Sequence, residues 1–184
     1  MSDKKFTLSR RALAALPLLA GLGLAAGAQA KAARALNAED KLAIQDLFSN
    51  YVWAYDCGDH ESFITLFTDD AVVNGRGKMY NDRAAIMSWF DYLLKMRDTE
   101  GDDIWMHEAG QFRYDGNADK CIVYAYATHF NGNTKTTARG VRSLGYFVCE
   151  CVKVKGAWKF RRFSITTWDK SIVPWKKPLP WPQG

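Results

Sequence analysis

The sequence predicts one α+β domain, in which helices come first and a strongly bent antiparallel sheet follows. Up to Met96 the apolar residues recur with the period of about 3.6 residues that is typical of amphipathic helices. From Ile104 onward they alternate with a period of about two residues, as in strands. Helices followed by antiparallel strands are typical of layered α+β domains, and residues 31–184 have the size of one such domain.

Residues 1–30 have the pattern of a cleaved export signal. Basic residues, including the pair Arg10-Arg11, precede the apolar stretch 12–28, which ends in the small-residue sequence Ala28-Gln29-Ala30. The paired arginines resemble a twin-arginine signal, which predicts a periplasmic protein. The stretch is interrupted by glycine and shorter than the about 20 apolar residues that span a bilayer. We therefore expect no membrane anchor after cleavage; an uncleaved N-terminal anchor is the alternative.

Charge and cysteine content exclude two classes of function. The chain carries +5, but four basic residues and Asp3 give the predicted signal +3, which leaves about +2 for residues 31–184. No stripe of Lys and Arg remains there, so no nucleic-acid partner is expected. The cysteines match no zinc-site spacing, and we expect them to be small buried residues, with any disulfide left open. They are Cys57, Cys121, Cys149 and Cys151.

The first predicted helix runs from Asn37 to Tyr55. Asn37 is a favourable N-cap, and the two acidic residues that follow it suit the positive end of the helix dipole. The sequence Asp56-Cys57-Gly58-Asp59 then ends the helix, which puts Asp56 just past its C-terminus. One helical face carries the apolar residues Ile44, Leu47, Phe48, Tyr51, Val52 and Tyr55.

The remaining elements follow from local patterns. A short helix His60–Phe67 is followed by a short strand Ala71–Val73, the turn Asn74–Gly77 and a helix Arg83–Met96, which Asp82 caps. The prolines from Pro174 onward predict that the tail from about residue 171 is an extended arm. Four long strands are predicted, the last two joined by a hairpin at Lys155-Gly156: Ile104–Asp115, Lys120–Asn131, Arg139–Lys155 and Ala157–Trp168.

The hairpin between the first two long strands predicts where two histidines lie. A three-residue loop Asn117–Asp119 pairs Gly116 with Lys120 and puts His107 opposite His129 on one face. A two-residue loop would put them on opposite faces. Beside them the small residues Ala109, Ala125 and Ala127 leave space. The other face is apolar, which suggests burial against another subunit; it carries Ile104, Met106, Phe112, Tyr114, Ile122, Tyr124, Tyr126 and Phe130.

Three segments resemble the SnoaL-like family of the nuclear-transport-factor-2-like group. They are the run 43–51, the sequence Tyr55–Asp59 with the later run 66–71, and Gly156–Phe160 in the last hairpin. The resemblance covers about 120 to 130 residues and implies a cone-shaped α+β barrel. It is closest to the branch of scytalone dehydratase, bile-acid dehydratase and hexachlorocyclohexane dehydrochlorinase. That branch implies no cofactor or metal and a homotrimer, with a dimer as the alternative.

The resemblance also implies a set of catalytic residues. Asp56 and His107 stand where the branch has its aspartate and strand histidine, and Tyr51 matches a tyrosine of the bile-acid dehydratases. Tyr55 and His129 match residues of scytalone dehydratase. The dehydrochlorinases have a lysine where this chain has Tyr51, which argues against chlorinated substrates.

The chemistry of an imidazole and a carboxylate supports this assignment. A neutral imidazole can take a proton near neutral pH, and a carboxylate on its other nitrogen fixes the tautomer and stabilises the imidazolium. Elimination also needs an acid, for which Tyr51, Tyr55 and His129 are candidates. Core packing is the rival interpretation for both tyrosines, and a structural role is the rival for His129.

Substrate-binding residues are predicted more weakly. Trp53, Trp105 and Trp168 are candidates for the walls of an apolar pocket, although core packing explains them equally well. Arg142, like Arg139, could meet an anionic substrate, with solvent exposure as the alternative. His60 is assigned no function.

The prediction is therefore a lyase acting on a hydroxylated cyclic or aromatic small molecule. An isomerase that moves a proton without a leaving group is the alternative enzyme. A non-catalytic ligand carrier or assembly subunit is the alternative outside catalysis.

Overall fold

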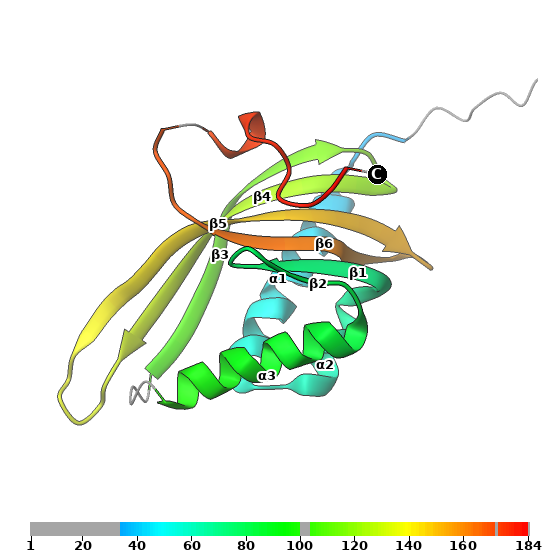
Figure 1. Ribbon diagram of the computed structural model, residues 1–184. Coiled ribbons are helices and arrows are strands. Elements are labelled where there is room, and N and C mark those ends of the chain that lie inside the picture. Colours follow the sequence, from blue (N-terminus) through cyan, green and yellow to red (C-terminus); the bar gives the residue numbers. More distant parts are fainter. Residues whose placement is uncertain (1–33, 100–103, 172, 184) are drawn as a thin grey trace, which may run out of the picture. The chain divides into compact units, whose positions relative to one another are not determined.

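A six-stranded mixed sheet packs on three helices (Figure 1). The computed structural model describes residues 34–183 except 100–103 and 172, so the predicted export signal lies outside the described residues. The helices are α1 (Ala38–Cys57), α2 (His60–Thr65) and α3 (Arg83–Thr99). The strands are β1 (Phe67–Gly75), β2 (Lys78–Tyr80), β3 (Ile104–Gly116), β4 (Lys120–Gly132), β5 (Arg139–Val154) and β6 (Ala157–Thr167).

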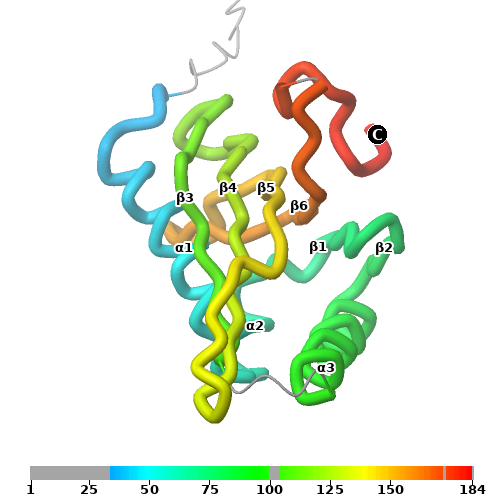
Figure 2. The backbone as a smooth tube through the Cα atoms, turned by 90° about the vertical axis from the view of Figure 1, so that its left-hand side faces the viewer, coloured from blue at the N-terminus to red at the C-terminus, as the bar shows by residue number. Residues whose placement is uncertain are grey.

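The strand order is β2-β1-β6-β5-β4-β3, and β3, β4 and β5 bend over α1 (Figure 2). The predicted α+β class is confirmed, but the sheet is not wholly antiparallel, because β1 pairs in parallel with β6. The predicted strand Ala71–Val73 is only part of β1, and β2 was not predicted. The polar sequence Thr68-Asp69-Asp70 interrupts the apolar alternation of β1, and its pairing with β6 is irregular between Phe67 and Val72.

Helix α1 is longer than predicted at its C-terminal end. Asn37 caps it as expected, in a capping box with Asp40. Gly58 ends it with φ 73°, a left-handed conformation that glycine adopts without steric cost. Asp56 therefore lies inside the last turn and not past the end, as the sequence had suggested. Helix α2 is shorter than predicted, and α3 extends three residues beyond Met96.

The β3–β4 hairpin brings His107 opposite His129 as predicted, but by a different route. Gly116 pairs with Cys121 and not with Lys120, which shifts the register by one residue next to the loop. A bulge at Gln111, which has φ 51°, then restores the predicted register.

The bulge also corrects the predicted faces of β3. Beyond it Phe112 and Tyr114 turn inward and pack against the core, although both were predicted on the outer face. Phe112 meets Phe48 of α1 edge to face, with ring centroids 5.3 Å apart. Without the bulge, Gln111 and Arg113 would occupy the inner face, so the extra residue keeps polar side chains out of the core.

The cysteines follow the prediction for three of the four residues. Cys121, Cys149 and Cys151 are buried in β4 and β5 as free thiols. Cys57 is exposed at the end of α1.

The C-terminal tail covers part of the outer face of the sheet, on the side away from the helices (Figure 1). Trp181 packs on Tyr124 and Tyr146, so the chain's own tail covers Tyr124, a residue of the face predicted to lie against another subunit. The tail also contains a 3-10 turn, Pro174–Lys176, because proline is tolerated at the first helical position. A subunit contact stays a prediction for the residues of the predicted face that are exposed, Met106 and Tyr126.

None of the described helices is long and apolar enough to cross a membrane.

Candidate active site

Asp56 and His107 meet although 51 residues separate them in the sequence. The last turn of α1 presents the carboxylate to β3, where Oδ1 lies 2.6 Å from Nδ1 of His107. The backbone N–H of His107 donates to Oδ2 at 2.8 Å. The carboxylate thus holds both the ring and the backbone of one residue. A carboxylate accepts hydrogen bonds, so Nδ1 of the neutral ring carries the proton and Nε2 keeps a lone pair.

The imidazole of His107 is held in a stack of rings. Tyr55 lies 4.6 Å from it, centroid to centroid, at an interplanar angle of 26°. His129 lies 4.3 Å from it at 19°. Stacking restricts rotation of the imidazole, so the bond to Asp56 and the stack together fix where Nε2 points. Nε2 of His107 has no hydrogen-bond partner among the described residues, and the ring lines a cavity.

His129 is a neutral partner in this stack. Burial, first of all, and then the positive charges of His107, Arg142 and Arg76 lower the pKa of His129 to about 4. Only one of the two stacked imidazoles is therefore charged when His107 takes a proton near neutral pH. His129 Nε2 and Trp105 Nε1 are buried without a hydrogen-bond partner among the described residues. Such unpaired groups cost free energy and are uncommon outside functional regions.

A cavity of about 740 Å³ opens beside the two histidines. This volume is within the range of small-molecule sites. Of the predicted substrate-binding residues, Trp105 and Arg142 line it, and so do Tyr51, Tyr55, His107 and His129. Asp56 contacts His107 and is not among the residues that line the cavity. Three further aromatic residues, from β2 and α3, also line it: Tyr80, Trp89 and Tyr92.

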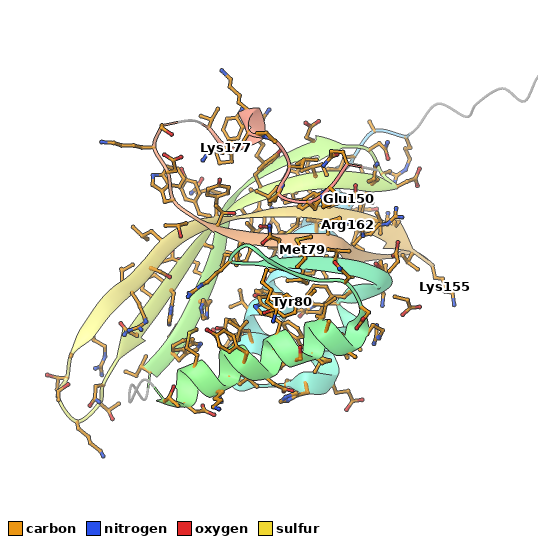
Figure 3. The ribbon with its side chains drawn as sticks, in the orientation of Figure 1. Met79, Tyr80, Glu150, Lys155, Arg162 and Lys177 are labelled. Atoms are coloured by element: carbon orange, nitrogen blue, oxygen red, sulfur yellow. The ribbon has the colours of Figure 1, made fainter. Side chains whose placement is uncertain are left out.

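Figure 3 shows Tyr80 in the space between the edge of the sheet and α3. Its ring centroid lies 6.1 Å from that of Trp89, so the two residues form one aromatic wall.

Tyr51 both packs in the core and lines the cavity. Its ring packs into the core, 4.7 Å from Phe163 and 5.6 Å from Phe63, and only 2% of the residue is exposed. It nevertheless lines the cavity. Burial raises the pKa of its phenol, so the hydroxyl is neutral and can donate a hydrogen bond.

Two of the predicted pocket tryptophans do not line this cavity. Trp53 lies on the solvent side of α1 with 68% of its surface exposed. It is two residues, about half a helical turn, away from both Tyr51 and Tyr55, so its side chain lies on the opposite face of the helix. Trp168 lies on the outer face of the sheet, near Tyr126. His60 forms a surface pair with Asp91 at 2.8 Å, in line with its assignment to no function.

Sequence reasoning missed Arg76, Lys78, Tyr80 and the α3 residues of the cavity wall. The turn Asn74–Gly77 was recognised, but β2 was not, so nothing indicated that this turn faces the histidines. Among the described residues, no cluster of His, Cys, Asp or Glu side chains has the arrangement to hold a metal ion.

A curved mixed sheet over N-terminal helices defines the class: the cystatin-like, nuclear-transport-factor-2-like α+β fold. The chain belongs to the SnoaL-like domain family, which it matches over residues 37–164.

Solved structures agree with this fold. A protein of unknown function from Nostoc punctiforme, with a cystatin-like fold, is 23% identical with a TM-score of 0.61, over 75% of this chain and 97% of that one. A protein from Novosphingobium aromaticivorans, provisionally described as a scytalone dehydratase, is 21% identical with a TM-score of 0.59, over 71% and 85%. The hexachlorocyclohexane dehydrochlorinase LinA type 2 is 18% identical with a TM-score of 0.57, over 70% and 85%. No curated protein sequence matches the chain.

Proposed function

We propose that the protein is a cofactor-independent lyase that eliminates water, or a comparable small group, from a hydroxylated cyclic or aromatic molecule. The observation that carries the proposal is the Asp56–His107 pair at the cavity, with Nδ1 bonded to the carboxylate and Nε2 left without a protein partner. The neighbouring lyases of the same fold, a dehydrochlorinase and a provisional dehydratase, add support for the class of reaction only.

In the proposed reaction Nε2 of His107 removes a proton from a carbon next to the one that carries the hydroxyl. The electrons of the C–H bond form the double bond while the C–O bond breaks. The departing oxygen takes a proton and leaves as water. Asp56 stabilises the imidazolium, and general-base action of this kind contributes about 10²–10⁴ in rate.

The acid for the leaving group is best assigned to Tyr51 among the three candidates. Its phenol is neutral and lines the cavity. His129 is a weaker candidate, because its pKa of about 4 leaves it without a transferable imidazolium proton at neutral pH. Tyr55 stacks on His107, and the stack gives it a positioning role.

An isomerase uses the same pair to return the proton to a different carbon of the substrate. The product separates the two reactions, since an isomerase leaves the mass of the substrate unchanged and a dehydratase removes water. A ligand carrier would bind without any turnover.

The test is a screen of hydroxylated aromatics and steroids with the mature protein, read by mass spectrometry. We expect His107→Ala and Asp56→Asn to lose about 10²–10⁴ in kcat while they stay folded. The surface pair His60–Asp91 offers matched controls. His60→Ala and Asp91→Asn remove the same residue types outside the cavity, and both should keep wild-type turnover. Binding without turnover in the wild type, or full activity in His107→Ala, would contradict the proposal.

A further inference from the structure

Three cationic residues line the cavity. Arg76 lies on the turn between β1 and β2, Lys78 is the first residue of β2, and Arg142 belongs to β5. Among the described residues that line the cavity there is no aspartate or glutamate. The wall is therefore aromatic and cationic, which is the composition expected for an aromatic molecule with a negative charge.

Neither Arg76 nor Lys78 has an acidic partner in the described part of the chain. No ion pair forms with Arg76 or Lys78 there, and Lys78 lies 5.0 Å from the ring centroid of Tyr80. Several other cations of this protein are paired with carboxylates, such as Arg83 with Asp69 and Arg161 with Asp70. A guanidinium without a carboxylate partner, at the wall of a cavity, is available to bind an anion.

The turn is held in place over the cavity by several contacts. Gly75 packs so closely on Trp89 that a Cβ there would lie 2.6 Å from the indole nitrogen, so only glycine fits. The Asn74 side chain accepts from Gly77 N–H at 2.8 Å and donates to the Pro180 carbonyl at 2.7 Å. Arg76 itself has φ 53°, which is uncommon for a residue with a side chain and tends to persist where its position matters.

The same turn is within electrostatic reach of the histidines. The charge of Arg76 contributes to the lowered pKa of His129, which stacks on His107. A molecule that fills the cavity can therefore contact the turn with one end and lie beside Nε2 of His107 with the other.

We propose that the substrate of this active site carries an anionic group, such as a carboxylate, that binds Arg76 and Lys78 and thereby orients the rest of the molecule toward His107. This inference deepens the proposed function and rests on it for the use of the cavity.

The test compares two ligands that differ in charge and little else, 4-hydroxycinnamate and its primary amide. Binding to the mature protein is followed by tryptophan fluorescence, since Trp89 and Trp105 line the cavity. We expect the carboxylate to bind about tenfold more tightly than the amide, with an advantage that shrinks as salt is added. Arg76→Gln should remove most of this advantage and leave the affinity for the amide unchanged. Arg83→Gln, a cation already paired on the surface of α3, is the matched control and should change neither affinity.

Equal affinity of the wild type for the two ligands, or an equal loss for both in Arg76→Gln, would overturn the inference. The outcome is separable from that of the lyase proposal, because His107→Ala should still prefer the carboxylate. Selective binding without turnover would contradict the lyase and support the anion site. Turnover without any preference for the anion would support the lyase and contradict the anion site.

Discussion

Helix α1 carries a paired carboxylate near each end, buried at Asp40 and partly buried at Asp56, and the two have different surroundings. Asp40, in the first turn, is 3% exposed. It accepts hydrogen bonds from Arg34 at 2.8 Å, from Trp158 at 3.3 Å and from the Lys153 ammonium. The Lys153 hydrogen bond is the largest of the effects that lower the pKa of Asp40 to about 2. Every partner of this carboxylate is a protein group.

The carboxylate of Asp56, in the last turn, binds a single residue, His107. Only one of the two ring nitrogens of His107 takes part. Both carboxylate oxygens bind His107, and Nε2 of the same ring is left toward the cavity. The comparison shows that a buried aspartate and its cation do not by themselves indicate catalysis. What distinguishes the Asp56 pair is the unpaired nitrogen beside a space large enough for a substrate.

The comparison of the two carboxylates is tested first by Asp40→Asn, for which we expect the largest effect. Removing the buried carboxylate leaves the partly buried Lys153 ammonium without its partner, so we expect a loss of about 3 kcal/mol in the free energy of unfolding. Turnover per folded molecule should stay close to wild type. Urea denaturation followed by far-UV circular dichroism, with an activity assay below the transition, measures both.

Acid titration gives a control for this prediction. The folded pKa of Asp40 is depressed to about 2, so the stability that its ionisation contributes is present above its ordinary pKa of 3.8 and is lost as the pH falls through about 2. Asp40→Asn should lack this part of the acid sensitivity. If the stability of Asp40→Asn falls with acid as steeply as that of the wild type, the ionised Asp40 does not stabilise the fold.

A smaller effect is expected from Tyr51→Phe, which removes one hydroxyl from the cavity and leaves the aromatic packing intact. We expect kcat to fall about 10²-fold, the lower end of what a general acid contributes, while stability changes little. Tyr92→Phe is the control, because Tyr92 also lines the cavity but is 57% exposed. An unchanged kcat in Tyr51→Phe would leave this residue with core packing alone.

The last effect concerns the pH dependence of stability that His129 adds next to the Asp56–His107 pair. Its folded pKa is lowered from 6.5 to about 4, so the unfolded chain binds a proton that the folded chain does not. The contribution of His129 to stability is therefore full above pH about 6.5 and declines as the pH falls toward about 4. His129→Gln should flatten this part of the curve. A curve of unchanged slope would mean that His129 titrates alike in both states.

The sequence predicted the elements that have a clear period and missed those that depend on distant partners. Strands β3 to β6 were predicted within two residues of their observed ends, because alternation is strong in all four. The facing of His107 and His129 was also predicted. The loop was wrong by one residue and the bulge at Gln111 compensated for it, which no local pattern indicated.

Other features depended on tertiary contacts that the sequence does not encode locally. Strand β2 has three residues and forms only because β1 lies beside it, so the cationic turn between them could not be placed near the histidines. The position of Trp53 could have been predicted, since it lies two residues from each cavity tyrosine on the same helix. Its apolar character was given more weight than its position on the helix.

The central claim is that Asp56 fixes the tautomer of His107 so that Nε2 is the proton acceptor. Imidazole ¹⁵N chemical shifts, recorded for residues 31–184 at a pH where the ring is neutral, test it without a known substrate. The account predicts that His107 carries its proton on Nδ1. In Asp56→Asn the backbone N–H of His107 keeps the amide oxygen, so the amide NH₂ faces Nδ1 and the proton moves to Nε2. A wild-type ring with its proton on Nε2, or the same tautomer in both proteins, would contradict the account.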